Sequence, residues 1–135
     1  YGFKSIIAND NDKGLSGKAI SQMMEDSQRN IWIGTEDGGI TIYNPEKDSY
    51  SYINKTSRPF YLSINNVHAI HDDGYGNIWV GTFLGGLHQF DIKKNKTTIY
   101  TNKIGDKSSL SNDYVYAIYR DSRGNLWIGT QNGLN

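Results

Sequence analysis

The chain has 135 residues, with 14 basic and 14 acidic side chains, 15 glycines, no cysteine and 13 % aromatic residues. This length suits one ordinary domain with a hydrophobic core of its own. Because only 36 % of the residues are hydrophobic and no apolar run approaches the length of a spanning helix, the sequence excludes a membrane-embedded chain and predicts no direct membrane contact. The formal net charge of zero predicts no nucleic-acid partner, and the absence of cysteine excludes disulfides and thiolate chemistry.

An internal repeat dominates the sequence. Three tryptophans, Trp32, Trp79 and Trp127, lie 47 and 48 residues apart, and each stands in the phrase Asn-(Ile/Leu)-Trp-(Ile/Val)-Gly-Thr. An aspartate precedes each tryptophan by six residues, and a glycine turn follows it. Self-similarity at a fixed period of this size is the signature of a repeat array.

In chain order, each repeat predicts four short strands joined by tight turns that are rich in Asp, Asn, Ser and Gly. The first and second strands are expected at Ala19–Glu25, Val67–Asp72 and Val115–Arg120, and at Ile31–Thr35, Ile78–Thr82 and Leu126–Thr130. The third and fourth are expected at Ile40–Tyr43 and Leu87–Ile92, and at Tyr50–Asn54 and Thr98–Asn102, with Tyr1–Ile6 as a first copy of the fourth. Four strands in a period of about 45 residues is typical of a β-propeller blade.

The fold class predicted is therefore all-β, with propeller blades of four antiparallel strands. Both faces of the first strand are apolar, as required of a sheet that lies between two neighbours, and the first strand is expected at the central axis. The repeat units are 1–49, 50–97 and 98–135, the last one truncated, so that the chain supplies about three blades of a larger propeller. Three blades cannot close a ring, so we expect the open blade edges to associate, giving a homo-oligomer.

The repeated phrase resembles the two-component regulator propeller repeat, and the likeness covers almost the whole chain. This resemblance implies seven-bladed propellers in the periplasmic sensor region of bacterial hybrid histidine kinases, with an oligosaccharide as ligand. The phrase Asp121-Ser-Arg-Gly-Asn-Leu-Trp127 is also similar to the Asp-box of glycan-processing propellers, where it is a structural turn. The repeated Asp, Trp, Gly and Thr residues are accordingly interpreted as scaffold, with the glycines giving room beside the indole and the tryptophans packing between blades.

Candidate ligand-binding residues are sought where the repeats differ, in the loops between strands two and three and between strand four and the next strand one. Sugar recognition requires aromatic faces together with amide, carboxylate or guanidinium groups. The residues of these types that we predict at the site are Glu36, Asp37, Arg58, Phe60, Tyr61, Asn66, Phe83, Asn112 and Asn132.

No catalytic, cofactor or metal motif is recognised. His68 and His71 lie an odd number of residues apart on one strand, so their side chains point to opposite faces and cannot chelate one ion together. The leading hypothesis is a non-catalytic periplasmic sensor fragment. Two alternatives remain open: a protein-interaction propeller, for which Phe60-Tyr61-Leu62 and Phe83-Leu84 provide apolar surface, and part of a glycan-processing enzyme.

Overall fold

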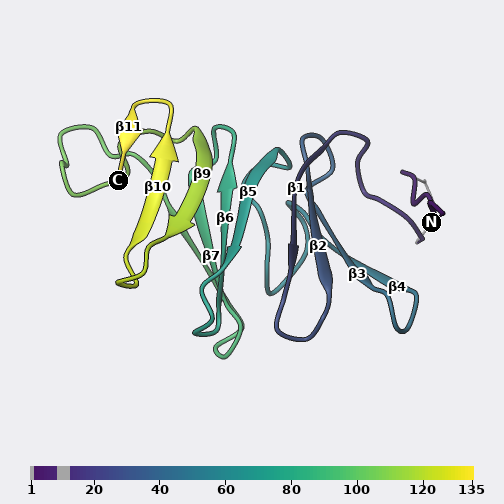
Figure 1. Cartoon of the computed structure of the whole chain (residues 1–135). Helices are drawn as coiled ribbons and strands as arrows, with labels where there is room; N and C mark the ends of the chain where they lie inside the picture. Colours follow the sequence, from purple (N-terminus) through teal and green to yellow (C-terminus); the bar gives the residue numbers. More distant parts are fainter. Residues whose placement is uncertain (1, 9–12) are drawn as a thin grey trace.

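The computed structural model describes residues 2–8 and 13–135, and these residues form three antiparallel β-sheets (Figure 1). The first sheet contains β1 (Ile20–Glu25), β2 (Ile31–Thr35), β3 (Ile40–Asn44) and β4 (Ser49–Ile53) in that order. The second contains β5 (Val67–Asp72), β6 (Asn77–Thr82), β7 (Leu87–Asp91) and β8 (Lys96–Tyr100). The third contains β9 (Val115–Arg120), β10 (Leu126–Thr130) and the two-residue β11 (Gly133–Leu134). The all-β blade architecture predicted from the sequence is confirmed, and the strand bounds differ from prediction by at most two residues.

Each sheet is a meander, because consecutive strands pair through short turns. The turns that join β1 to β2, β5 to β6 and β9 to β10 all require one residue with a positive φ angle directly before the conserved asparagine. Arg29 (64°), Gly76 (94°) and Gly124 (87°) occupy this position. Glycine adopts such angles without a steric penalty, so two of the three repeats use it where the turn demands it.

A β-bulge recurs near the start of the first strand of every sheet. The pairing register slips between Ile20 and Gln22 in β1, and between Val67 and Ala69 in β5. The corresponding slip in the third sheet lies between Gly129 and Thr130 of β10, opposite the start of β9. A bulge bends the strand and changes the direction of the side chain at that point. The side chain of the bulged residue can therefore point to the surface of the protein.

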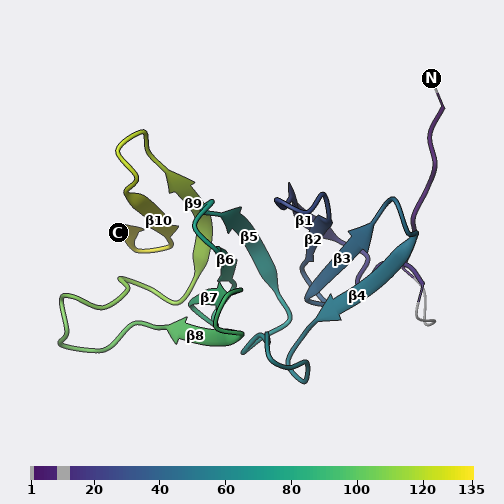
Figure 2. The same ribbon diagram turned by 90° about the horizontal axis from the view of Figure 1, so that it is seen from below.

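The three sheets are fanned so that their first strands, β1, β5 and β9, lie near one another, while the outer strands β4 and β8 lie far apart (Figure 2). Contacts between sheets are made mainly by β1 with β5 and by β5 with β9, as expected for strands at the inner edge of a propeller. The hydrophobic core consequently lies between sheets. One cluster joins Trp32 and Ile40 of the first sheet to Val67, Ile70 and further residues of the second, and a second cluster joins the second sheet to the third.

Two glycines of the repeated phrase make this packing possible. A Cβ atom on Gly34 would lie 2.8 Å from Cγ1 of Val67, and one on Gly81 would lie 2.5 Å from Cγ1 of Val115. Both distances are well below carbon–carbon contact. Gly34 and Gly81 therefore do permit a close approach, and the group that approaches each of them is the first valine of the next sheet.

The two outer faces of the array lack a neighbouring sheet. Trp32 is 4 % exposed between the first and second sheets, whereas Trp127, at the same position in the third sheet, is 40 % exposed. On the opposite outer face, Ile20 and Met23 are also exposed, although the residues aligned with them in the second and third sheets are buried or half-buried. Packing between blades thus accounts for two of the three tryptophans, and Trp127 faces solvent here because no fourth sheet covers it.

The N-terminal segment corrects one expectation. Residues 2–6 form no strand, Tyr1 lies outside the described residues, and Phe3 is fully exposed. β3 already pairs with β4, so residues 2–6 are not needed as the fourth strand of the first sheet. The sheets run over 20–53, 67–100 and 115–134, offset by one strand from the repeat units 1–49, 50–97 and 98–135.

No helix among the described residues is long and apolar enough to cross a membrane.

Candidate functional site

The repeated aspartate and tryptophan form a clamp across each turn between the first and second strands. In the first repeat, Oδ1 of Asp26 accepts the backbone N–H groups of Gln28 and Asn30, both at 2.9 Å. Its Oδ2 accepts the Asn30 amide and the indole N–H of Trp32. The indole-to-carboxylate distances are 2.8 Å for Trp32 and Asp26, 3.1 Å for Trp79 and Asp73, and 2.9 Å for Trp127 and Asp121. The prediction that these aspartates hold the turn is confirmed, and the indole contact is an addition to it.

These hydrogen bonds keep the aspartates ionised. Burial alone raises the pKa of Asp26, but the hydrogen bonds from Trp32 and Asn30 outweigh it and lower the pKa below its ordinary value. The pKa of Asp121 falls to about 2, chiefly through the hydrogen bond from Trp127 and then those from Asn125. A carboxylate saturated by donors in this way is a structural anchor and has little capacity left for a ligand.

His88 is a second internal anchor. It is fully buried on β7, and its Nε2 accepts the backbone N–H of Ser63 at 3.0 Å, which fixes the linker between the first two sheets. Burial lowers the pKa of His88 to about 4, so the imidazole is neutral at pH 7. Thr41, at the same position in the first sheet, holds the backbone N–H of Ser16 in the same way.

The upper face, at the top of Figure 1, carries the turns from β2 to β3 and from β6 to β7, together with the links between sheets. On this face, an aromatic cluster brings together Phe83, Tyr114, His68 and Tyr116. The Phe83 ring meets Tyr114 edge-on at 4.4 Å between centroids and lies 5.5 Å from His68, which in turn meets Tyr116 at 5.8 Å. Because β5 and β9 are inner strands, the cluster lies at the inner end of this face, and Tyr116 remains 43 % exposed.

Two predicted amides border the aromatic cluster. The backbone N–H of Phe83 donates to the carbonyl of Asn66 at 3.0 Å, which places Asn66 directly beside the ring. The side-chain Oδ1 of Asn66 is buried and has no hydrogen-bond donor among the described residues. Asn112 lies at the other border, where its Oδ1 accepts the backbone N–H of Tyr114. The structure thus groups Asn66, Phe83 and Asn112 of the predicted set around one aromatic surface.

The remaining predicted residues lie elsewhere. Arg58 stacks over the ring of Tyr61 at 4.2 Å in the long link between β4 and β5. Phe60 packs on the hydrophobic core with its ring 5.3 Å from that of Phe90, so it serves the interior of the fold. Thr97 of β8 donates to the carbonyl of Pro59, which holds this part of the link beside an outer strand, away from the inner aromatic cluster.

Glu36, Asp37 and Asn132 are exposed on the turns that follow β2 and β10. Asp37 accepts the backbone N–H of Lys18 at 3.2 Å, and the backbone N–H of Asn132 donates to Thr130. These three residues lie on the upper turns of the first and third sheets. In the sequence, they come before and after the residues of the aromatic cluster.

Sequence reasoning missed His68, Tyr114 and Tyr116 as members of the site. His68 and Tyr116 occupy the bulge of the first strand, where the first repeat has Ser21. That position varies among the repeats while its neighbours are repeated. The same rule that selected variable loops would have found it, had it been applied inside the strand.

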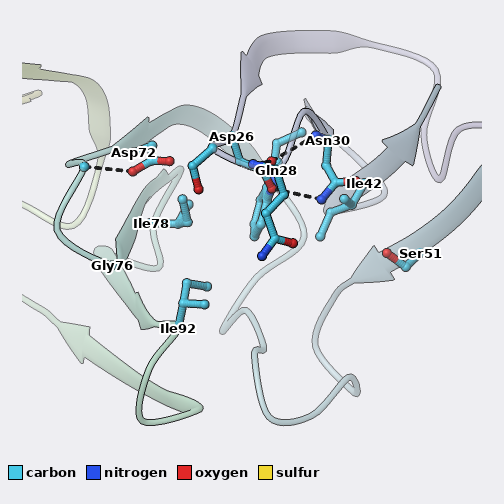
Figure 3. A pocket seen from close by; sticks show the side chains of 12 residues that line it. Asp26, Gln28, Asn30, Ile42, Ser51, Asp72, Gly76, Ile78 and Ile92 are labelled. Carbon is cyan, nitrogen blue, oxygen red and sulfur yellow. Dashed lines mark hydrogen bonds between the residues drawn. The ribbon is translucent and has the colours of Figure 1, made fainter. Parts of the chain in front are cut away.

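A cavity of about 340 Å³ lies on the opposite, lower face between the first two sheets (Figure 3). It is bounded by the turns after β1 and β5 and by the apolar side chains of Ile42, Ile78 and Ile92. Gln28, Ser51 and other polar residues complete its lining. None of the residues predicted for the site contributes to this lower-face cavity.

Among residues 2–8 and 13–135, no group of three or more histidine, aspartate or glutamate side chains is arranged to hold a metal ion.

Comparison with known proteins agrees with this architecture. The sequence profile of the two component regulator propeller family matches residues 14–37, 61–83 and 109–132, more than half of the chain. Each matched segment includes the tryptophan phrase of one sheet and ends in the upper turn that follows it. The protein is a repeat propeller protein, and its chain belongs to the two component regulator propeller family. No curated protein sequence matches the chain significantly.

Solved structures show the same fold. The chain is similar to the extracellular domain of the putative hybrid two component system BT3049 from B. thetaiotaomicron, with a TM-score of 0.82 and 22 % identity over 97 % of this chain. It is also similar to the extracellular domain of the putative hybrid two component system BT4673 from the same organism (0.65, 25 % identity, 88 % of this chain). PorZ, a surface component of the type-IX secretion system of Porphyromonas gingivalis, matches with a TM-score of 0.70 and 21 % identity over 96 % of this chain. The chain spans 17 %, 17 % and 18 % of these three structures, respectively.

Proposed function

We propose that the chain is part of the extracytoplasmic, non-catalytic sensor region of a two-component regulatory system, and that it binds an oligosaccharide on its upper face. The observation that carries the proposal is the aromatic cluster at the inner end of that face, formed by His68, Phe83, Tyr114 and Tyr116. Family membership and the two extracellular domains among the similar structures support the sensor role and the extracytoplasmic, periplasmic location.

The chemistry of the cluster suits a sugar. Aromatic faces stack against the apolar C–H surface of a pyranose ring, while amides and hydroxyls bond its hydroxyl groups. The phenol groups of Tyr114 and Tyr116 make no hydrogen bond to another described residue, so both can bond the hydroxyl groups of a sugar. An oligosaccharide, which presents several rings, can cover the cluster and reach the polar turns that carry Glu36 and Asn132.

Binding, and not turnover, is the role that fits a sensor. An occupied propeller would bias the arrangement of the receptor subunits and so the activity of a histidine kinase elsewhere in the receptor. A ligand can shift such an equilibrium only by the difference in its affinity for the two arrangements. Contacts that join two blades, as this cluster joins β5 and β9, are suited to sense that difference.

A thermal-shift screen tests the proposal. The chain is heated with each member of a panel of oligosaccharides, and the same panel is applied to Tyr116→Ala and, as a matched control on the same strand, Tyr119→Ala. We expect one class of oligosaccharide to raise the melting temperature of the parent chain and of Tyr119→Ala, and to lose most of this effect in Tyr116→Ala. If no oligosaccharide stabilises the chain, or if the two variants respond alike, the proposal is wrong.

A protein partner is the second candidate. Leu84 follows Phe83 on the same turn, has a φ angle of 80° and is exposed, so it presents an apolar side chain beside the aromatic cluster. A screen in which no glycan acts would favour this candidate.

A further inference from the structure

The lower-face cavity shown in Figure 3 is separate from the upper-face aromatic cluster. It lies between the first and second sheets, on the side of the turns from β1 to β2 and from β5 to β6. We propose that it is a second binding site, which takes a small uncharged polyol of about one sugar ring.

The size of the cavity matches such a ligand. Its volume of about 340 Å³ is at the lower end of the range that small-molecule pockets occupy, roughly 300 to 1,000 Å³. A space of this size accommodates a single ring. The site therefore differs from the upper face in the size of ligand as well as in position.

Polar groups with unused hydrogen-bonding capacity line the cavity. The side-chain amide of Gln28 extends into the space between Ile92 and Ser51 (Figure 3) and bonds no other described residue. The hydroxyl of Ser51 is likewise without a partner in the described part of the chain. Asp72 uses Oδ1 for the backbone N–H of Gly74 at 2.8 Å, which leaves its other oxygen as an acceptor.

These groups are complementary to hydroxyls. An amide both donates and accepts, a serine hydroxyl does the same, and a carboxylate accepts from a hydroxyl through a charge-assisted bond. The walls formed by Ile42, Ile78 and Ile92 give the apolar surface that the C–H face of a ring requires. The arrangement of one apolar wall and a few convergent polar groups is typical of a small-ligand site.

The charge of the site selects against anions. Asp26 and Asp72 are the charged residues of the lining, and the hydrogen bonds that lower the pKa of Asp26 keep it ionised. Because both oxygens of Asp26 are already saturated within its turn, Asp72 is the carboxylate that can bond a ligand. The side chain of Lys93 lies close to Gly76 at the border, so the surroundings also contain a cation. A neutral polyol suits this environment better than a uronic acid.

The test uses two-dimensional NMR of the tryptophan indole N–H groups. Trp32 lines the cavity and donates to Asp26, whereas Trp127 makes the same bond to Asp121 and does not line this cavity, so the two signals report the site and a control in one spectrum. The chain is titrated with glucose, galactose, mannose and myo-inositol, and with glucuronate as the anionic counterpart. We expect at least one neutral ring to shift the Trp32 signal with a dissociation constant on the order of millimolar, to leave Trp127 unchanged, and to bind more tightly than glucuronate.

Two variants locate the binding. Gln28→Ala and Asp72→Asn should each weaken it about tenfold, the effect of losing one good hydrogen bond. Asparagine retains an oxygen for the Gly74 N–H, and Gln28 is exposed, so neither variant should unfold the chain. Gln131→Ala, the same change on an exposed upper turn, is the control and should bind normally. The proposal is overturned if no neutral ring shifts Trp32, if both lower-face variants bind normally, or if Tyr116→Ala abolishes the effect, which would assign the ligand to the upper face.

Discussion

The packing of Gly81 against Val115 gives the sharpest prediction of how the sheets fit together. Replacing Gly81 by alanine would put a Cβ atom 2.5 Å from Val115 Cγ1, whereas carbon atoms pack at about 3.5 to 4.0 Å. The second and third sheets must then separate by about 1 Å or distort. Overpacking of this kind costs about 1 to 3 kcal/mol, partly offset by about 0.5 to 1 kcal/mol because alanine loses less conformational entropy than glycine. We therefore expect Gly81→Ala to lower the free energy of unfolding by about 1 kcal/mol, and by no more than about 2.5 kcal/mol.

Gly129 supplies a matched control within the same molecule. It stands at the same position of the repeat, but the atom nearest to a Cβ built there is Ala117 Cβ at 3.4 Å, an ordinary contact. Gly129→Ala should therefore be neutral or stabilising by up to about 1 kcal/mol. Urea unfolding followed by tryptophan fluorescence measures both variants.

A double-mutant cycle identifies the clash. Val115→Ala removes two buried methyl groups and should cost about 2 kcal/mol by itself. In this background Gly81→Ala has no Cγ1 to meet, so the double variant should be about as stable as Val115→Ala alone. The coupling energy should then equal the loss that Gly81→Ala causes by itself. Additive losses, or equal effects of Gly81→Ala and Gly129→Ala, would refute the account of how the sheets pack.

Three further predictions concern the anchors and the open faces. The pKa of His88 is about 4 in the folded chain, against an ordinary value of 6.5. The neutral imidazole therefore stabilises the fold fully above pH 6.5, and up to about 3 kcal/mol of this stability is lost as the pH falls to about 4. In His88→Gln, the free energy of unfolding measured in urea should depend less on pH between 6.5 and 4. Asp73→Ala should destabilise the chain by about 1 to 3 kcal/mol, and Asp121→Ala should destabilise it by less, because the hydrogen bonds of the third turn are exposed. If calorimetric melting ranks the two variants in the opposite order, the role of these aspartates in stability is contradicted. We also propose that two copies associate head to tail through their outer faces, which expose Met23 on one side and Trp127 on the other. Light scattering should then show concentration-dependent dimers, and Met23→Glu and Trp127→Glu should each abolish them. A chain that stays monomeric at high concentration would count against this contact.

The repeat made most of the fold predictable. Four strands, their order along the chain and the turn held by Asp26, Asp73 and Asp121 all follow from one phrase that occurs three times. The role of Gly34 and Gly81 did not follow, because the sequence does not reveal which neighbour approaches a glycine. Residues 2–6 form no strand because β-propensity is realised only through pairing, and the position beside β3 is occupied by β4.

The site was less predictable than the fold. The search of variable loops selected Asn66, Phe83 and Asn112, which the structure gathers in one place. Residue type alone could not show that Phe60 faces the core, since an aromatic residue suits an interior as well as a ligand. His68 and Tyr116 escaped because the search for variable positions was confined to loops, whereas the bulge places a variable position inside the first strand.

The central claim is that an oligosaccharide binds the aromatic cluster of the upper face, and saturation-transfer difference NMR tests it most directly. Irradiation of the aromatic protons of the chain transfers saturation to the ring protons of a sugar that stacks on them. The account predicts this transfer to one class of oligosaccharide, with most of it lost in Tyr116→Ala and retained in Tyr119→Ala. Absence of transfer to every oligosaccharide tested, or equal transfer in the two variants, would contradict it.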